Sequence, residues 1–456
     1  MKKYEMDLLH GSLWKKILIY SIPLMFTNIL QVVFNMSDIA VVGKFVGPIA
    51  LGAVGSTSIL VTLFTGLLIG LASGVNALTA LHIGSNNNKD VRETVHTAGI
   101  LCLMAGIIIM ALGIVFSRTI LETMNTKDEL IADAVLYLRI YLAGMPALAL
   151  YNFGNAVLSA AGDTRRPLLY LFLAGVINVV LNLFFVIVCH LGVAGVAIAS
   201  IIAQYISAVL ILISLFKSQE NFSLRMAYLG MNSGKLTRIL RIGIPSAFQY
   251  ALFAIANLFV QASVNSFDHV MVEGNAAAAN ADSLIYDMMA AFYTAAASFM
   301  AQNLGAHKRD RILKSYLISL AYSFFLGLIL GISLYIFRYP FLSLFTSDNG
   351  VVEAGIRRLS IMSLSYAISA FMDCTIAASR GLGRTAVPTV IVIMGSCVFR
   401  IIWIYTVFAH FRTIESLYLL YACSWLVTAI AEAVYFAKIY RRIVPKKEDS
   451  DVLYLS

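Results

Sequence analysis

One stretch of the chain, residues 45–88, runs for 44 residues without a lysine, arginine, aspartate or glutamate. Apolar stretches of 18 or more uncharged residues recur along the whole length, and each is long enough to cross a bilayer as a helix. Only 12% of the 456 residues are charged, whereas a soluble domain averages about 25%. The stretches show no alternation of polar and apolar residues, which excludes a β-barrel. The sequence therefore predicts an all-α polytopic membrane protein.

The chain contains an internal duplication, because similar motifs recur after 221 or 222 residues. "ILIYSIPLMFTNIL" resembles "ILRIGIPSAFQYAL", "HIGSNNNKDVRETV" resembles "NLGAHKRDRILKSY", and "AAGDTRRPLLYL" resembles "SRGLGRTAVPTVIV". The anchor pairs are Pro23 and Pro245, Gly84 and Gly305, Gly162 and Gly383, Thr164 and Thr385, and Pro167 and Pro388. Several anchors at nearly one separation indicate that one half was copied from the other.

The duplication predicts twelve transmembrane helices, six in each half. The second half has room for only one span before Gly305, so the equivalent stretch 49–81 is expected to be one long helix. Because six is even, both halves enter the membrane from the same side, which gives two six-helix lobes related by a parallel pseudo-two-fold repeat. We place the N-terminal lobe at 1–216, a cytoplasmic linker at 217–237, and the C-terminal lobe, with a short basic tail, at 238–456.

The basic residues predict the orientation. With the N-terminus in the cytoplasm, the cytoplasmic segments hold 24 of the 33 lysines and arginines, the opposite segments hold 8, and Arg400 lies inside a span. This asymmetry favours cytoplasmic N- and C-termini in a multi-pass protein of the cytoplasmic membrane. It also accounts for the net charge of +9 without a nucleic-acid partner.

A polar stripe crosses the first span. Asn28, Gln31, Asn35 and Asp38 are spaced by three, four and three residues, so they share one face of a helix. An ionisable side chain within a span indicates function by default, because burying it is costly. The stripe therefore either lines a path for water or ions, or forms a hydrogen-bonded seam between helices.

Two later spans carry polar pairs. Asn178 and Asn182 are four residues apart, and Ser200 and Gln204 repeat that spacing, so each pair shares a helix face. Either pair can simply join neighbouring helices. Together with Asp38 they can also form one polar nest in the first lobe.

The second half lacks a counterpart of Asp38, since the equivalent position falls near Val260. A lone buried cation is costly, so we expect Arg400 to pair with an acid. Pro23 removes a backbone hydrogen bond from the helix that carries Asp38, which makes it a candidate hinge or a static kink. The second half has its own intramembrane charges, which are Asp282, Asp287, Asp373, Arg400 and Glu432.

Enzyme signatures are missing from the sequence. We find no HExxH, GxSxG, Walker A or dinucleotide-binding motif, so catalysis and ATP hydrolysis have no visible site. The five cysteines have no metal-ligand spacing and fall in or beside apolar stretches, where they are expected to pack as small core residues. No metal or cofactor is expected, apart from a coupling ion.

These motifs resemble the multidrug and toxic compound extrusion (MATE) transporters over essentially the whole chain. The resemblance implies two six-helix lobes that form a V around a central cavity and export cationic or amphiphilic organic compounds in exchange for H⁺ or Na⁺. The matching pieces are the Ile-Pro of the first span, "MSDIAVVGKFVG", "HIGSNNNKDVRE", "AAGDTRRPLLY", "GVAGVAIASIIAQ", "GNAAAANADSLIYDMMAAFYTAAASFMAQNLGAHKRDR" and "SRGLGRTAVP".

The resemblance also implies a coupling site. The first-span aspartate of the family falls on Asp38, the fifth-span asparagine on Asn178, and the sixth-span hydroxyl on Ser200. A second acidic position of the family is occupied here by Asn182, which weakens a sodium site because one negative charge is missing. This departure favours H⁺ and leaves Na⁺ open.

We therefore expect a monomeric antiporter that works by alternating access on a small organic substrate, with membrane lipid around it. Its substrate cavity is expected to include Gln31, Asn35, Asp287, Asp373 and Arg400. Acids, methionines and aromatic rings there suit a lipophilic cation. The main alternative is a flippase or exporter of a lipid-linked or anionic metabolite on a related fold. An intramembrane enzyme and a non-transporting receptor are further alternatives, which the motifs and the duplication disfavour.

Overall fold

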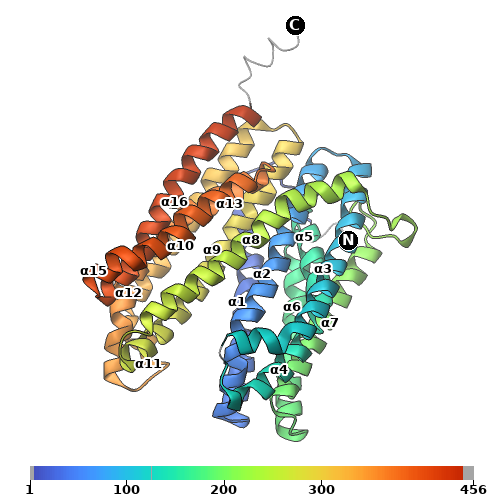
Figure 1. The fold of residues 1–456 in the computed structure, drawn as a ribbon. Helices are drawn as coiled ribbons and strands as arrows, with labels where there is room; N and C mark the ends of the chain where they lie inside the picture. The colour runs from blue at the N-terminus through green and yellow to red at the C-terminus, as the bar shows by residue number, and fades with distance from the viewer. Residues whose placement is uncertain (1–4, 125, 445–456) are drawn as a thin grey trace. The chain divides into compact units, whose positions relative to one another are not determined.

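The computed structural model describes residues 5–124 and 126–444, and these residues form helices and turns without a β-strand (Figure 1). The long helices are α1 (Leu13–Phe45), α2 (Pro48–Gly84), α3 (Asn88–Thr123), α7 (Gly192–Lys217), α8 (Ser233–Val264), α9 (His269–Gly305), α10 (Arg309–Ile336), α12 (Asn349–Gly381) and α16 (Ile414–Ile443). The shorter elements are α4 (Asp128–Leu142), α5 (Met145–Ala160), α6 (Arg165–Leu183), η1 (Phe184–Val188), η2 (Met226–Tyr228), α11 (Arg338–Ser343), α13 (Ala386–Val392), η3 (Ile393–Val398), α14 (Phe399–Trp403), η4 (Ile404–Phe408) and α15 (Ala409–Phe411).

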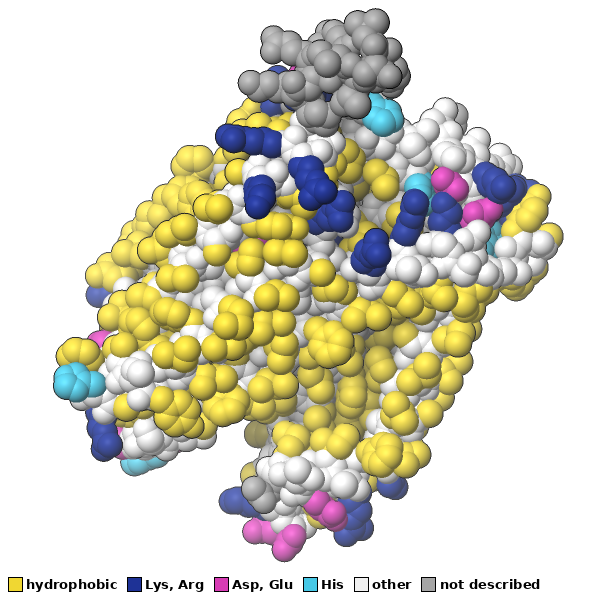
Figure 2. Space-filling model, turned by 45° about the horizontal axis from the view of Figure 1, so that its top comes forward, with side chains coloured by type: hydrophobic (Ala, Val, Ile, Leu, Met, Phe, Trp, Pro, Cys, Tyr) yellow, Lys and Arg dark blue, Asp and Glu magenta, His cyan; other side chains and the backbone are white. Residues whose placement is uncertain are grey.

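The described helices confirm the polytopic all-α fold. Eleven helical stretches are long and apolar enough to cross a membrane, and the bent pair α4 and α5 makes up to twelve when it counts as one span. The ambiguous stretch 49–81 lies within α2, a single helix of 37 residues, as the repeat predicts. Figure 2 shows hydrophobic side chains along the sides of the helices and lysine and arginine gathered near helix ends.

The fourth predicted span is interrupted where α4 meets α5. The two helices are bent by 44° at a break after Leu142. Pro146 lies in the first turn of α5, where its missing N–H costs no helical hydrogen bond. Gly144 allows a close approach at the break, because a Cβ there would lie 2.1 Å from Oε1 of Gln204. The fourth span is therefore a bent pair of helices.

Backbone contacts divide the chain into two compact units. The first unit comprises the described residues up to Asp7 and Phe26–Ala251, and the second comprises Leu8–Met25 and the described residues from Leu252. Helices α1 and α8 each contribute to both units, since their first halves and second halves are assigned differently. The lobe boundaries expected from the sequence, at 216 and 238, stay predictions.

Each unit has an apolar core of its own. In the first unit the core includes Tyr151, Phe153 and Leu158 of α5, all almost fully buried. In the second unit it includes Met362 and Tyr366 of α12, which are fully buried. These cores hold in place the helices that carry the polar side chains described below.

The duplication is visible in the turns. Residues with a left-handed backbone recur at a separation of 221 or 222, although such a conformation is uncommon outside glycine. The pairs are Asn86 (φ 53°) and His307 (φ 54°), Gly162 (φ 90°) and Gly383 (φ 73°), and His190 (φ 53°) and Arg412 (φ 50°). The two halves therefore share their turn geometry as well as their motifs.

A π-helical stretch explains why the separation changes along the chain. Pro167 and Pro388 are 221 residues apart, whereas His190 and Arg412 are 222 apart. Between these anchors the first half contains one π-helical segment, η1, whereas the second half contains two, η3 over Ile393–Val398 and η4 over Ile404–Phe408. A π-bulge accommodates one extra residue within a helix. Beyond η3, the residue equivalent to Asn178 is therefore Arg400.

Candidate functional site

Four predicted polar residues of the first unit meet around one buried carboxylate. Asp38 of α1 is only 7% exposed. Asn182 of α6 donates its amide N–H to Oδ1 of Asp38 at 2.5 Å, and Ser200 of α7 donates its hydroxyl to Oδ2 at 2.7 Å. Asn178 donates to the Ser200 hydroxyl at 3.3 Å and accepts from Asn182 at 3.3 Å. We call these four residues the Asp38 cluster.

A close approach of α1 and α6 brings the cluster together. A Cβ placed on Gly175 of α6 would lie 1.6 Å from the ring of Phe34 on α1. Phe34 is one turn before Asp38, and Gly175 is one turn before Asn178. Because glycine leaves room for the phenylalanine ring at this crossing, the polar residues one turn further along can reach each other.

The donors and acceptors of the cluster leave one oxygen without a partner. Both oxygens of Asp38 accept hydrogen bonds, whereas Oδ1 of Asn182 is buried and has no hydrogen-bond partner among the described residues. A buried acceptor without a donor is costly. The cluster therefore offers an extra acceptor to a proton donor or a small cation that enters it.

Two tyrosines that the sequence analysis did not single out lie near the cluster. Tyr137 and Tyr141 of α4 are close enough for the charge of Asp38 to act on their hydroxyl groups. Their rings stack with centroids 5.9 Å apart, and both side chains are buried. The sequence signal that could have identified these two tyrosines is their spacing of four residues, which places both on one face of the fourth span.

The rest of the polar stripe on α1 is more open than Asp38. Asn28 and Gln31 are half-buried and Asn35 is exposed, so burial is greatest at the aspartate. Gln31 and Asn35 make no hydrogen bond to the Asp38 cluster among the described contacts. Pro23 lies inside α1, and its role as a hinge stays a prediction.

The second unit contains a buried ion pair that the sequence analysis did not predict. Arg358 of α12 is 4% exposed and forms an ion pair with Asp282 of α9. It also donates to Oδ1 of Asn275 at 2.6 Å, and Tyr366 donates its hydroxyl to Asp282. Asp282 and Arg358 are thus one network, and that carboxylate is already neutralised.

The expectation that Arg400 pairs with an acid is wrong, because Arg400 forms no ion pair among the described residues. Its Nη1 donates to Oδ1 of Asn257 at 2.8 Å, and its Nε donates to the Ser424 hydroxyl at 3.4 Å. The guanidinium lies 4.6 Å from the ring centre of Tyr421, and the side chain is 2% exposed. Amide, hydroxyl and aromatic groups stabilise the cation where a carboxylate was expected.

The remaining candidates for a substrate cavity are Asp287 of α9 and Asp373 of α12, which are both half-buried. Asp373 lies within electrostatic reach of Arg380 and Arg400. No group of three or more His, Cys, Asp or Glu side chains that could hold a metal ion occurs in the described part of the chain. The Asp38 cluster, with its single carboxylate, suits a proton or one monovalent cation.

Known proteins match most of the chain. The family model described as MatE matches residues 23–184 and, a second time, residues 245–406. Both ends of these matches are separated by 222 residues, which confirms the internal duplication.

Individual relatives match at lower identity. A probable multidrug resistance protein, YoeA of Bacillus subtilis, is 26% identical over 387 residues, which cover 83% of this chain and 84% of the relative. The FAD transporter of Shewanella oneidensis is 26% identical over 356 residues, which cover 76% and 77% of the two chains.

A solved structure shows the same fold. It is that of a MOP superfamily transporter from Pyrococcus furiosus, with a TM-score of 0.90 at 23% identity. The match covers 96% of this chain and 98% of that protein.

Proposed function

Since the chain is a membrane transporter of the MatE family and not an enzyme, we propose that it is a secondary active antiporter. It exports cationic or amphiphilic organic compounds across the cytoplasmic membrane in exchange for H⁺ or Na⁺. The observation that carries this proposal is the Asp38 cluster, where one buried carboxylate is held by side chains from α6 and α7. Asp38 has no cationic partner among the residues that the structure describes, and a buried charge without one favours the binding of a cation.

The cluster favours a proton as the coupling ion. The Asn182 amide can only donate from its nitrogen, but the Ser200 hydroxyl can rotate and either donate or accept. A proton on Oδ2 of Asp38 can therefore be donated to Ser200, while Oδ1 still accepts from Asn182. Both protonation states keep two hydrogen bonds, which suits a group that loads and unloads a proton in every cycle.

Sodium is the alternative ion at the same place. The cluster presents carboxylate, amide and hydroxyl oxygens, and Oδ1 of Asn182 is left without a donor among the described residues. Na⁺ benefits from several oxygens, but the cluster has only one negative charge. Under either ion, binding at Asp38 favours one arrangement of the protein and substrate binding favours another, and each acts only through its differential affinity.

The substrate class follows from charge and from the relatives. Asp287 of α9 and Asp373 of α12 are half-buried carboxylates, and their acidic character suits a cationic substrate. YoeA is named a probable multidrug resistance protein, which is consistent with organic substrates of this kind. With both repeats on one chain, a monomer is sufficient for the cycle.

An anionic substrate is the second candidate, and one relative favours it. The Shewanella protein is named an FAD transporter, and FAD carries phosphates. The buried cations Arg358 and Arg400 are the groups that such a substrate would need, but both are almost fully covered and already hydrogen-bonded. We therefore place the cationic substrate first.

The distribution of lysine and arginine supports cytoplasmic termini, as inferred above.

The test of the proposed function uses everted membrane vesicles that contain the full chain, with cationic dyes and FAD offered under separate H⁺ and Na⁺ gradients. Dye transport that follows the pH gradient and disappears with Asp38→Asn supports the proposal. Transport of FAD alone, or dye transport that ignores both gradients, contradicts it.

A further inference from the structure

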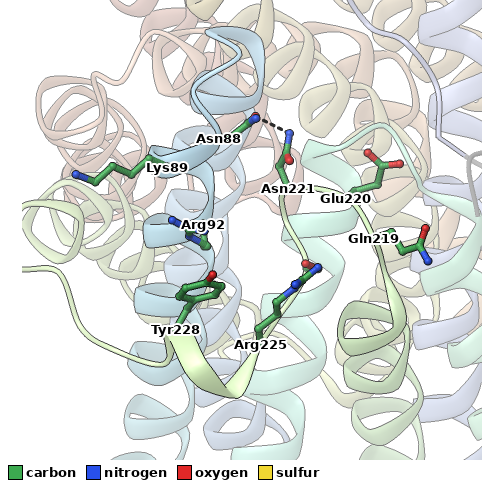
Figure 3. Close-up of a pocket in the computed structure, with 9 residues that line it drawn as sticks. Asn88, Lys89, Arg92, Gln219, Glu220, Asn221, Arg225 and Tyr228 are labelled. Carbon is green, nitrogen blue, oxygen red and sulfur yellow. Dashed lines mark hydrogen bonds between the residues drawn. The ribbon is translucent and has the colours of Figure 1, made fainter.

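A polar cavity lies in the first unit, between the first turns of α3 and the segment that follows α7. Its volume is about 220 Å³. Figure 3 shows the first turns of α3 on one side and residues 219–228 on the other, with Asn221 donating to Asn88 at 2.5 Å. The backbone N–H of Arg225 donates to His96 Nε2 at 3.0 Å, which fixes the second wall to α3.

The charge balance of this cavity is positive. Lys89, Arg92 and Arg225 line it, against one carboxylate, Glu220. Lys89 is 4.0 Å from Glu93, whereas neither Arg92 nor Arg225 forms an ion pair within the described residues. The Arg92 guanidinium lies 4.2 Å from the ring centre of Tyr228, which orients it (Figure 3). A guanidinium group without an ion pair among the described residues can donate hydrogen bonds to phosphate oxygens.

Apolar side chains continue from the cavity along the same segment. Met226 is 70% exposed, Leu229 is 49% exposed, and Met231 is 43% exposed. Exposed apolar residues beside basic ones are typical of segments that lie in a membrane interface. Arg92 is also only a few residues from the start of the apolar run of α3, which places the cavity at the height of lipid headgroups.

We propose that this cavity binds the phosphate of an anionic membrane lipid, with Arg92 and Arg225 as its ligands and Met226 and Leu229 in contact with the acyl region. The lipid, and not a soluble phosphate, is the occupant because the exposed apolar side chains are continuous with the cationic ones. The proposal does not depend on the transport reaction.

The test compares lipid retention by the purified full chain. Wild type and an Arg92→Gln/Arg225→Gln double variant are incubated with phosphatidylglycerol, phosphatidylcholine or inorganic phosphate, and lipid adducts are counted by native mass spectrometry beside melting temperatures. Arg118→Gln is the matched control, because it removes an exposed arginine at the other end of α3. We expect phosphatidylglycerol alone to bind, with affinity at least about tenfold lower in the double variant and unchanged in the control.

Three results would overturn the proposal. These are equal retention of phosphatidylglycerol by the double variant, equal loss in the Arg118→Gln control, and stabilisation of wild type by inorganic phosphate to the same degree as by the lipid. The last result would identify a site for soluble anions. The melting temperature without added lipid shows whether the double variant is folded.

A different observation carries a second inference, which concerns Arg400. It is the repeat equivalent of Asn178, while Asn257 is the equivalent of Asn35 and Val260 that of Asp38, all at a separation of 222. The helices that meet at Arg400 are α8, α14 and α16, which correspond to α1, α6 and α7 at the Asp38 cluster. Among the described residues, the first junction has the carboxylate of Asp38 without an ion-paired cation, and the second has the cation Arg400 without an ion-paired carboxylate, although Asp373 lies within its electrostatic reach.

We infer that Arg400 is a positioning residue that makes the second junction independent of ions. Its guanidinium fills the place where a coupling cation would bind and holds α8 and α16 through Asn257 and Ser424. Each transport cycle then uses one cation site. This inference rests on the proposed function, since it assumes that Asp38 binds the coupling ion.

Three variants of the full chain, reconstituted in liposomes, separate this inference from the proposal it rests on. Arg400→Lys keeps the charge and is expected to keep transport, whereas Arg400→Met is expected to lose it. Val260→Asp/Arg400→Asn gives the second junction the chemistry of the first, so the dependence of rate on cation concentration should become steeper. Folded Arg400→Met protein with wild-type transport and cation dependence overturns the inference. Normal coupled transport by Asp38→Asn would instead overturn the proposed function.

Discussion

Replacing Asp38 by asparagine removes the charge of the cluster and almost nothing else. The two side chains have the same shape, and the asparagine oxygen can accept from Asn182 as Oδ1 does now. The new amide N–H₂ then faces Ser200, whose hydroxyl can turn and accept. The geometry therefore predicts that both hydrogen bonds of Asp38 survive the substitution in neutral form.

The magnitude of the stability change follows from two opposing effects. A hydrogen bond to a charged group contributes about 1.5–3 kcal/mol and a neutral one about 0.5–1.5 kcal/mol, so two weakened bonds cost roughly 2–3 kcal/mol. Removing a buried charge recovers several kcal/mol of desolvation. Asp38 is 7% exposed, so this recovery is nearly complete. The melting temperature of Asp38→Asn is therefore expected to equal or exceed that of wild type.

Transport is expected to behave in the opposite way. The variant has no group in the cluster that can release a proton or neutralise a cation, so an ion gradient can no longer drive export. The assay reconstitutes wild type and variant in liposomes and follows a cationic dye under an imposed pH gradient and, separately, an imposed Na⁺ gradient. Met36→Leu is the control, because Met36 lies on the same helix two residues from Asp38, its side chain is 42% exposed, and leucine conserves its volume.

The reasoning fails in either of two cases. Dye accumulation by Asp38→Asn that still follows the pH gradient would show that the coupling proton binds elsewhere. A melting temperature well below that of wild type would show that the charge itself holds α1, α6 and α7 together.

Three further predictions concern the surroundings of the cluster and the first described residues. Ser200→Ala removes the donor to Oδ2 of Asp38 and should cost about 1–3 kcal/mol of stability together with proton-driven transport, whereas Ser200→Thr should retain both by melting and dye assays. Gly175→Val places side-chain atoms where the Phe34 ring lies, so transport should fall and should partly return in the double variant with Phe34→Ala; no recovery would contradict the crossing described here. Burial raises the pKa of Glu5, so its share of stability is full at acid pH and is lost as pH rises through the raised pKa. Glu5→Gln should therefore reduce the fall in melting temperature as pH rises above the ordinary glutamate pKa of about 4.3, and an unchanged pH profile would contradict this.

Much of the fold could be predicted from the sequence because hydropathy and duplication constrain it strongly. The apolar run of α2 is long enough for two helices, and only its repeat partner α9 indicated a single one. Pro146 permits a kink between α4 and α5, but the sequence could not establish a break there, because Gly144 and Pro146 each occur inside membrane helices without breaking them. Whether such a pair bends a span depends on its neighbours, here Gln204 of α7.

The candidate site was only partly predictable. Spacing placed Asn178 and Asn182 on one face, but it could not show that this face meets Asp38, which depends on the crossing at Gly175. Arg358 was overlooked because it lies near a predicted helix end, where the count of lysine and arginine on each side of the membrane treats an arginine as part of the loop outside the membrane. Its partner Asp282 is on another helix, and only tertiary contacts reveal the pair.

The matched left-handed turns show that the two halves share backbone geometry at positions where their residues differ. His190 and Arg412 adopt the same unfavourable backbone conformation although they are different residues, and so do Asn86 and His307. Such geometry was inherited from the ancestor of both halves, and it survived the replacement of the residues that first adopted it. The polar chemistry differs between the copies, since Asp38 in one corresponds to Val260 in the other. The halves therefore differ in function through a few side chains while they share the geometry of their turns.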